Sequence, residues 1–262
     1  MMTREERKLI TVASGKGGVG KTWLSVTLGH YLASRGRRVL LFDGDLGLAN
    51  VDIQLGLTPR RDLGDVLSGE ASIAEAVTPI TTGIEAPGRF EVLAGKSGSG
   101  ALGGLNAAAL IALRQDLIEA AVDYDHVLLD LAAGIEPSVA ILSQHRGTVL
   151  VVLSPDPTSL TDAYAYIKLL HQRRPDADIR IVVNMAKSKR EGERTYEALR
   201  KVCRSFLRCD PPLAGIIRLD PKVRDAIRQQ TPLLARHPQC DALDGIERIA
   251  EPFLKPAPAE AS

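Results

Sequence analysis

The chain has 262 residues with a formal net charge of +1, and 45% of its residues are hydrophobic. This length suits one compact domain with a full core, and a charge so near zero gives no general attraction to nucleic acid or membranes. No apolar run approaches the ~18 residues that span a bilayer, Met1–Lys8 lacks the apolar stretch of a signal peptide, and the three cysteines form no C-x-x-C pair. We therefore expect a cytoplasmic protein with reduced thiols, no zinc site and no iron–sulfur cluster.

The first predicted elements are a short apolar, β-branched strand at Leu9–Ala13 and a helix that begins at Lys21 and ends near Gly36. The segment between them fits the pattern G-x-x-x-x-G-K-[ST]. A strand before it and a helix after it are the context in which this pattern binds a nucleoside triphosphate. The expected nucleotide-binding residues are Gly15, Lys16, Gly17, Gly18, Val19, Gly20, Lys21 and Thr22, together with Trp23, which follows directly.

Each residue type in this phosphate loop has a physical task. The glycines let successive backbone N–H groups turn inward and form a concave anion site. Lys21 is placed to reach the β- and γ-phosphates, and the Thr22 hydroxyl can bind Mg²⁺. The helix that begins at Lys21 adds the positive end of its dipole.

Two acids follow the next predicted strand, Arg38–Phe42, which ends in Asp43-Gly44-Asp45. Two carboxylates at a strand tip beside a phosphate loop are costly unless they meet a cation or a polarised water. Mg²⁺ and an attacking water would both be within reach of Asp43 and Asp45 in such a site.

A third acid ends the predicted apolar strand His126–Asp130, which is followed by Leu-Ala-Ala-Gly. This is the layout of a Walker B strand. Asp130 would hold Mg²⁺, directly or through water, and Gly134 would allow a loop that responds to the γ-phosphate.

Strand-like and helical patterns alternate through the rest of the chain, which predicts an α/β fold with one doubly wound, mainly parallel sheet flanked by helices. Ligands of such sheets bind at the carboxyl ends of the strands. We expect one P-loop domain over residues 1–254, a disordered tail over 255–262, and a loop at Gly95–Gly104. The further strands expected are Phe90–Leu93, Thr148–Leu153, Ile179–Asn184 and Leu213–Ile217. Three helix faces are expected, one with Leu110, Leu113, Leu117 and Ala121, one with Leu160, Ala163, Tyr164, Ile167 and Leu170, and one with Tyr196, Leu199, Cys203 and Phe206.

These motifs together resemble the MinD/ParA class of deviant Walker ATPases, P-loop proteins of the SIMIBI type whose phosphate loop has a second lysine. The matching segments are SGKGGVGKT, DGD and DLAAG. Within the class, the chain is similar to the FlhG family (also called FleN or YlxH), MinD-like ATPases that control flagellar number and placement. That likeness is carried by DGDLGLANVDIQLGL, SPDPTSLTDAYAYIK and VVNMAKS, and the resemblance extends from about Leu9 to Leu254.

The resemblance implies roles for the matching positions. Lys16 is similar to the signature lysine that reaches the partner subunit's phosphates in an ATP-bound homodimer. Asp45 is similar to the residue that orients the attacking water, so Lys16, Lys21 and Asp45 are the expected catalytic residues. Asp43 and Asp130 resemble the acids near Mg²⁺, and with Thr22 they form the expected metal set.

Further positions resemble residues that contact the base or hold the signature lysine. Asn184 resembles the asparagine that reads adenine, and Arg218, Leu219 and Asp220 match the loop that packs on the base. Asp156 and Asp162 match acids that hold the lysine when the γ-phosphate is absent.

The resemblance also implies a cycle and partners. ATP, ADP and Mg²⁺ are the expected ligands, and hydrolysis, slow and stimulated by a partner, would return an ATP-bound homodimer to monomers. The partners implied are an FlhF-type GTPase, flagellar basal-body proteins or a flagellar transcription regulator, in the cytoplasm or at the periphery of the inner membrane or cell pole.

Two other functions are compatible with this fold, although a metabolic ligase has no need of the second lysine. A ParA-like partition ATPase would bind DNA non-specifically as an ATP dimer, with steep salt dependence. A metabolic P-loop ligase of the dethiobiotin synthetase kind would use ATP as a monomer and only with its substrate. An electron-donating iron protein is excluded, because the cysteines are in the wrong places for a cluster that bridges a dimer.

The chain departs from the family pattern at three places. Met1–Lys8 has no DQA-type motif of the kind that stimulates FlhF, and Arg218 stands where the family usually has proline. The C-terminal segment Asp241–Lys255 has an apolar stripe but four acidic and two basic residues, the wrong sign for anionic lipid. We therefore expect weak or no membrane contact and a helix docked on the core, broken near its end by Pro252.

One basic segment, Lys187–Arg208, has eight basic residues and three acidic ones. It predicts either a solvated helix face or a docking surface for an acidic partner or DNA. Aromatic residues are scarce in it, so the sequence does not support base-specific recognition.

Overall fold

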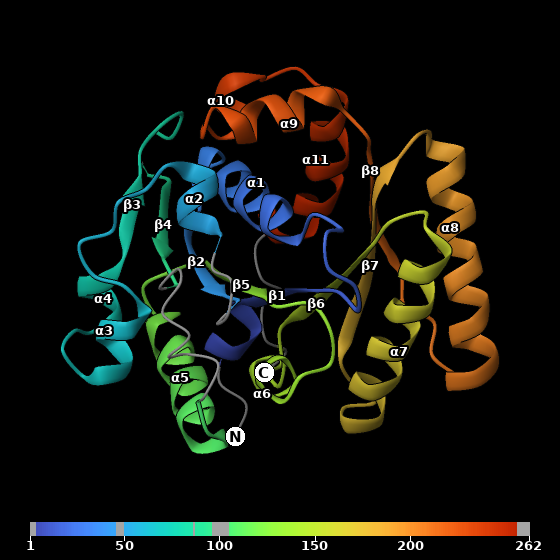
Figure 1. Cartoon of the computed structure of the whole chain (residues 1–262), viewed down its shortest axis with the longest axis horizontal. Coiled ribbons are helices and arrows are strands. Elements are labelled where there is room, and N and C mark those ends of the chain that lie inside the picture. Colours follow the sequence, from blue (N-terminus) through green and yellow to red (C-terminus); the bar gives the residue numbers. More distant parts are fainter. Residues whose placement is uncertain (1–3, 46–49, 86, 96–104, 256–262) are drawn as a thin grey trace.

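A computed structural model describes residues 4–45, 50–85, 87–95 and 105–255 of the chain. Its strands form one eight-stranded sheet in the order β3-β4-β2-β5-β1-β6-β7-β8 (Figure 1). All neighbouring strands are parallel except β3 and β4. The strands are β1 (Leu9–Ala13), β2 (Arg38–Gly44), β3 (Thr78–Ile80), β4 (Arg89–Leu93), β5 (His126–Leu131), β6 (Thr148–Leu153), β7 (Asp178–Ala186) and β8 (Leu213–Arg218).

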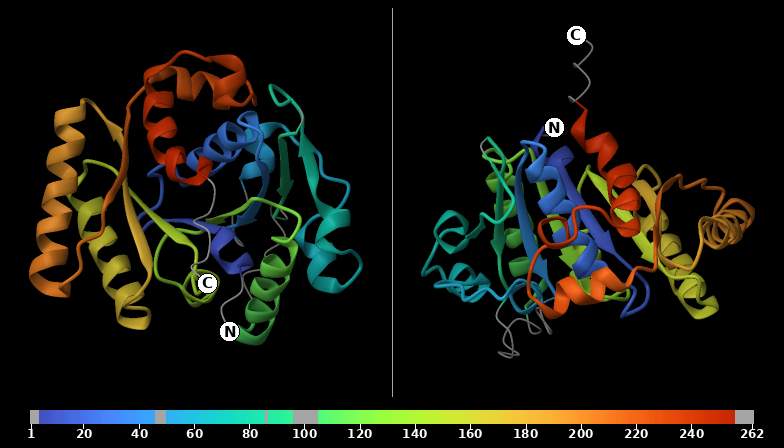
Figure 2. Two further views of the ribbon diagram at one scale, coloured as in Figure 1. Left: turned by 180° about the vertical axis from the view of Figure 1, so that it is seen from behind. Right: turned by 90° about the horizontal axis from the view of Figure 1, so that it is seen from above.

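Helices cover both faces of the sheet. One buried cluster holds side chains of α1 (Lys21–Ser34), α2 (Val51–Leu55), α9 (Pro221–Arg228), α10 (Leu233–Arg236) and α11 (Asp241–Leu254). The other holds side chains of α3 (Leu63–Ser68), α4 (Ile73–Ala76), α5 (Ala107–Ala120), α6 (Pro137–Leu142), α7 (Pro157–Arg173) and α8 (Lys189–Val202). Figures 1 and 2 show α1 lying against the C-terminal helices, and α10 and α11 both contact it. Because both faces of the inner strands are buried, these strands are apolar at consecutive positions.

The predicted fold class is confirmed, and all seven expected strands are present, with bounds that differ by at most two residues. The three-residue strand β3, which contains Pro79 and pairs antiparallel with β4 at the sheet edge, was not predicted from the sequence. A run so short, with a residue that cannot donate to the ladder, has almost no sequence signal. The expected tail lies outside the described residues, except for Lys255. The expected Gly95–Gly104 loop also lies outside them, except for Gly95.

Two predictions about helices were wrong. Phe206 was placed on a buried helix face, but its exposed fraction is 74%. The α-helical turn ends at Val202, and Cys203–Leu207 forms a π-helix, whose wider turn rotates the following side chains away from the 3.6-residue spacing. The C-terminal helix was expected to break at Pro252, but α11 runs through it to Leu254. Proline has a helical φ, so near a helix end it removes one hydrogen bond without stopping the next residues.

The C-terminal helix is docked on the core, as the sequence predicts. Its apolar residues Leu243, Ile246 and Ile249 are buried, and the helix contacts β8 and α1. No helix in the described part of the chain combines the length and apolarity needed to cross a bilayer.

Candidate nucleotide site

The phosphate loop connects the carboxyl end of β1 to the first turn of α1, at the centre of the sheet. Gly18 and Gly20 have positive φ angles of 75° and 87°, which L side chains rarely adopt. A Cβ at Gly15 would lie 2.0 Å from the backbone oxygen of Asp162, whereas a Cβ at Gly17 or Gly18 would meet nothing within 4 Å. The loop is thus tightly packed at its base and open at its tip, where a phosphate would be held by backbone N–H groups.

Strand register brings two of the predicted acids side by side. Asp43 on β2 is the register partner of Asp130 on β5, and each is only 1% exposed. Burial and, to a smaller extent, the charge of Asp130 raise the pKa of Asp43 to about 7. Burial likewise raises the pKa of Asp130 to about 6, against the lowering effects of Thr22, Lys21 and Ser25. Two buried carboxyls side by side, one of them near the Thr22 side chain, are a donor set that suits a hard cation such as Mg²⁺.

Asp130 is held in place from the first turns of α1. The Ser25 hydroxyl lies 3.1 Å from Asp130 Oδ1 and 3.0 Å from the backbone oxygen of Lys21, and the nearby Thr22 side chain lowers the pKa of Asp130. Ser25 was not predicted from the sequence. Its only signal is its position one helical turn after Lys21, which places it on the same face of α1 as that lysine.

Asp43 organises the segment that follows β2. Its Oδ2 atom accepts hydrogen bonds of 3.0 Å from the backbone N–H groups of Asn50 and Val51, at the start of α2, and its Oδ1 accepts one from Asp45 N–H at 3.3 Å. A carboxylate at this helix start satisfies N–H groups that otherwise have no partner. Asp43 thus holds the Asp45 backbone and the start of α2, a role that the sequence did not reveal.

Lys21 and Asp45 complete the inner part of the site. Lys21 is 9% exposed, and burial lowers its pKa while the charges of Asp130 and Asp45 raise it. The charge of Asp45 also raises the pKa of Asp130. These couplings place Lys21, Asp45 and Asp130 within one electrostatic neighbourhood.

The second lysine of the loop lies at its outer side. Lys16 Nζ forms an ion pair of 2.9 Å with Asp156 Oδ2 and hydrogen-bonds the Thr158 hydroxyl. Its backbone oxygen accepts a hydrogen bond of 2.6 Å from Ser14 Oγ. Asp156 and Thr158 belong to the start of α7, so Lys16 is held within its own subunit. Among the described residues, Asp162 has no ion pair with Lys16. Its backbone packs on Gly15 instead.

Comparison with known proteins agrees with this geometry. Residues 10–233 match the model of the CobQ/CobB/MinD/ParA nucleotide-binding domain. The chain belongs to this family. It is 37% identical over 244 residues to the antiactivator FleN of Pseudomonas aeruginosa. This alignment covers 93% of this chain and 85% of FleN. It is 34% identical over 200 residues to the flagellum site-determining protein YlxH of Helicobacter pylori, covering 76% of this chain and 65% of YlxH.

Solved structures of the MinD/ParA family share the fold. The septum site-determining protein MinD of Pyrococcus horikoshii, complexed with Mg-ADP, superposes with a TM-score of 0.76 and 27% identity, covering 94% of this chain and 95% of that one. As a member of the family, this chain has a nucleotide-binding domain, and the similarity to FleN and YlxH agrees with the resemblance to FlhG.

The predicted adenine-reading residue of this MinD/ParA domain lies under the phosphate loop. Asn184 is 3% exposed, and its Nδ2 donates a hydrogen bond of 2.8 Å to the Val19 backbone oxygen, while its Oδ1 accepts one from Met185 N–H. A Cβ on Gly20 would come within 2.5 Å of Asn184 Nδ2. In this structure Asn184 therefore braces the loop from β7, and any contact with a base stays a prediction.

The other predicted base-loop residues have different surroundings. Arg218 forms an ion pair of 2.6 Å with Asp241 of α11, and Asp220 caps α9 by accepting from Lys222 N–H at 2.9 Å. Leu219 is 53% exposed, while Trp23 is 5% exposed and belongs to the buried cluster around α1. Of these residues, Leu219 is the one with a free apolar surface that a base could cover.

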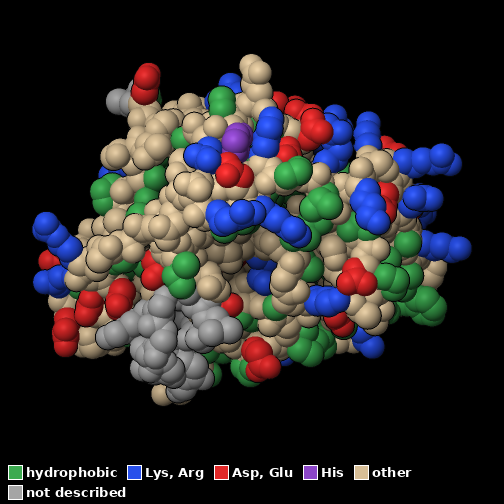
Figure 3. Space-filling view, turned by 45° about the horizontal axis from the view of Figure 1, so that its top comes forward, with side chains coloured by type: hydrophobic (Ala, Val, Ile, Leu, Met, Phe, Trp, Pro, Cys, Tyr) green, Lys and Arg blue, Asp and Glu red, His purple; other side chains and the backbone are tan. Residues whose placement is uncertain are grey.

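The basic segment forms an exposed face over α8 and the turn after it. Figure 3 shows Lys and Arg side chains gathered on this side of the molecule. Arg200 is paired with Asp210 and Glu197, and Phe206 protrudes at the end of the face. The residues of this face that are exposed are Lys187, Lys189, Arg190, Arg194, Lys201, Arg204 and Arg208.

Proposed function

We propose that the chain is a Mg²⁺-dependent ATPase that dimerises with ATP and regulates the number or placement of flagella, with hydrolysis returning the dimer to monomers. The observation that carries this proposal is Lys16, a second lysine on the phosphate loop, held at the surface by Asp156. The side chains of this pair are 36% and 52% exposed, so the pair contributes little free energy. Lys16 can therefore leave Asp156 and bind a γ-phosphate on a second subunit.

The site residues divide the chemistry between them. Lys21 and the loop N–H groups would bind the β- and γ-phosphates. Thr22, Asp43 and Asp130 would hold Mg²⁺, which would supply neutralisation of the phosphate charge. Asp43 also holds the start of α2 and the Asp45 backbone. Asp45, in the electrostatic neighbourhood of Lys21, orients the attacking water. Phosphoryl transfer needs positioning and charge neutralisation more than covalent help, so turnover is slow until a partner completes the site.

The flagellar role is inferred from relatives. One is named an antiactivator and the other a flagellum site-determining protein, so we place a flagellar transcription regulator first among the partners, with an FlhF-type GTPase and basal-body proteins after it. We propose a cytoplasmic location with at most weak membrane contact, because the apolar stripe of α11 is buried in the core.

The test is the number of flagella per cell, counted by electron microscopy in a strain that lacks this protein. Wild-type and Asp45→Ala copies are returned to it, and purified Asp45→Ala is assayed for ATP binding and phosphate release. We expect a changed count that wild type restores and Asp45→Ala does not, with ATP bound but turnover lower by about 10²-fold or more. Unchanged flagella would contradict the flagellar role, and parent-rate turnover would remove Asp45 from the mechanism.

A second candidate is a ParA-like ATPase that binds DNA as an ATP dimer. The exposed basic face over α8 favours it, since such a face attracts phosphate backbones without reading sequence. This candidate would be favoured if the chain is retained on duplex DNA only with ATP. Retention should then fall steeply with salt and be lost in Arg190→Glu/Arg194→Glu. Equal retention with and without ATP would count against it.

A further inference from the structure

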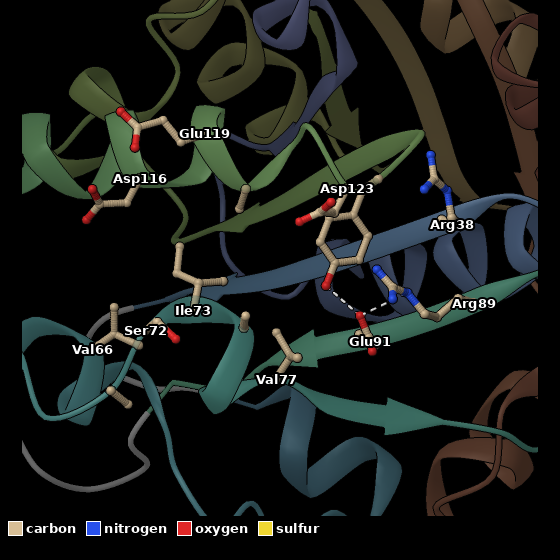
Figure 4. A pocket seen from close by; sticks show the side chains of 14 residues that line it. Arg38, Val66, Ser72, Ile73, Val77, Arg89, Glu91, Asp116, Glu119 and Asp123 are labelled. Carbon is tan, nitrogen blue, oxygen red and sulfur yellow. Dashed lines mark hydrogen bonds and ion pairs between the residues drawn. The ribbon is translucent and has the colours of Figure 1, made fainter.

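A groove of about 590 Å³ lies between the α3–α4 segment and α5, with β4 as its floor. Figure 4 shows its side chains in place. Arg38, the first residue of β2, lines it, whereas Asp43 of the nucleotide site lies toward the other end of the same strand. Five residues of strand separate these two positions by about 16 Å, so a ligand in the groove leaves the phosphate loop accessible.

One wall of this α4–α5 groove is apolar. Val66, Ile73 and Val77 point into it from the α3–α4 segment (Figure 4). Val66 and Val77 are partly exposed, whereas Ile73 is only 9% exposed and belongs to the core. Covering such side chains with an apolar partner is favourable because it removes apolar surface from water.

The opposite wall is acidic. Asp116 and Glu119 lie one turn apart on α5, and Asp123 follows the helix end. All three are exposed, and no lysine or arginine of the described residues forms an ion pair with any of them. Burial, together with the charge of Glu119, raises the pKa of Asp116, as expected where like charges gather without a cation.

The two arginines of the groove are already neutralised. Arg89 Nε lies 3.2 Å from Glu91 Oε2, which also accepts a hydrogen bond of 2.5 Å from the Tyr124 hydroxyl. Arg38 is paired with Asp125 at 3.5 Å. The charge presented to a ligand is therefore that of the acidic wall.

We propose that the α4–α5 groove is a docking site for a cationic, amphipathic peptide segment of a partner protein. The apolar side chains of that segment would cover Val66 and Val77, and its lysines or arginines would face Asp116, Glu119 and Asp123. Asp116 and Glu119 are separated by about 4.5 Å along the axis of α5, so the ligand needs two or more cations about one helical turn apart, which a helical segment supplies. Complementary charge would set the register and speed association. This docking site does not depend on the nucleotide cycle.

The test uses the full chain and random peptides displayed on phage. The library is panned on the wild-type chain with counter-selection on Asp116→Asn/Glu119→Gln, and enriched peptides are synthesised with a fluorophore for anisotropy titration. The matched control is Asp176→Asn/Glu251→Gln, which removes the same charge from two exposed acids on other elements. Ala74→Trp, at an exposed position of the apolar wall, fills the groove. Circular dichroism and thermal melting confirm that each variant is folded.

We expect enriched peptides with at least two basic residues among apolar ones. They should bind Asp116→Asn/Glu119→Gln and Ala74→Trp about tenfold or more weakly than wild type, and the control variant within about twofold. Failure to enrich any peptide, enrichment of peptides without net positive charge, or equal binding to the acidic-wall variant would each overturn the docking site. None of these results bears on ATP hydrolysis, so the proposed ATPase cycle stands or fails separately.

Discussion

Lys16 on the phosphate loop and Asp156 at the start of α7 form an ion pair of 2.9 Å, although 140 residues separate them in the chain. The pair keeps the second loop lysine inside its own subunit. If the dimer forms as we propose, Lys16 leaves Asp156 for a phosphate on the partner subunit. Only a surface ion pair then has to break for this exchange.

Removing the lysine should therefore abolish the dimer and turnover together. For Lys16→Ala we expect ATP-dependent dimerisation to be lost and phosphate release to fall by about a thousandfold, the range of a positive group supplied in trans. Light scattering after size exclusion and steady-state phosphate release measure both. Lys168→Ala on α7, at an exposed position, is the control and should behave as wild type. Normal ATPase activity in Lys16→Ala would refute the proposed cycle.

Removing the acid should have the opposite effect on assembly. In Asp156→Ala the lysine has no competing partner in its own subunit, so the ATP dimer should tighten by roughly two- to fivefold, the value of an exposed ion pair. Sedimentation equilibrium with a non-hydrolysable ATP analogue measures the dimer constant. Asp162→Ala is the matched control, because Asp162 contacts Gly15 through its backbone, and it should change nothing. A weaker dimer in Asp156→Ala would show that Asp156 acts in the assembled state.

Gly20 should tolerate no side chain. Gly20→Ala places a Cβ 2.5 Å from Asn184 Nδ2 at a φ of 87°, so we expect a loss of about 1–3 kcal/mol in the free energy of unfolding and a loss of nucleotide binding. Thermal melting and the fluorescence of Trp23, the single tryptophan, report the two effects. Gly17→Ala, whose Cβ would meet nothing within 4 Å, should leave the melting temperature unchanged. Equal melting of both variants would contradict the bracing role of Asn184.

Asp130 should destabilise the nucleotide-free protein at neutral pH. Its pKa is raised by burial to about 6, so the folded state holds its proton more tightly than the unfolded state. The free energy of unfolding should therefore fall as pH rises from about 4 to about 6, and stay lowered above that. Asp43, with a raised pKa of about 7, acts in the same direction and extends the fall to about pH 7.

Asp130→Asn tests this cost directly. At pH 7.5 we expect the nucleotide-free variant to be more stable by on the order of 1–3 kcal/mol, with a flatter pH profile, yet to bind Mg-ATP more weakly because the metal loses a carboxylate. Urea unfolding across pH and calorimetric titration measure the two quantities. Asp176→Asn, which removes an exposed carboxylate, serves as control. Lower stability of Asp130→Asn at pH 7.5 would mean that the interactions of Asp130 with Thr22 and Ser25 outweigh the burial of its charge.

The sequence by itself determined the local parts of this protein. The phosphate loop is contiguous, and its glycines, Lys21 and Thr22 have meaning at fixed spacing, so the pattern could be read before any tertiary contact was known. The inner strands could also be read, because burial on both faces leaves consecutive apolar residues. The family resemblance came from the same contiguous segments.

Only the tertiary structure decided which distant residues meet. Strand order depends on how apolar faces are buried together, which local periodicity does not encode, so the pairing of Asp43 with Asp130 could be expected only in outline. The support of Val19 by Asn184 and the three N–H groups held by Asp43 had no local signal. The same reason applies to Phe206, whose exposure follows from a π-helical turn, and to the α4–α5 groove, whose two walls are joined only by the fold.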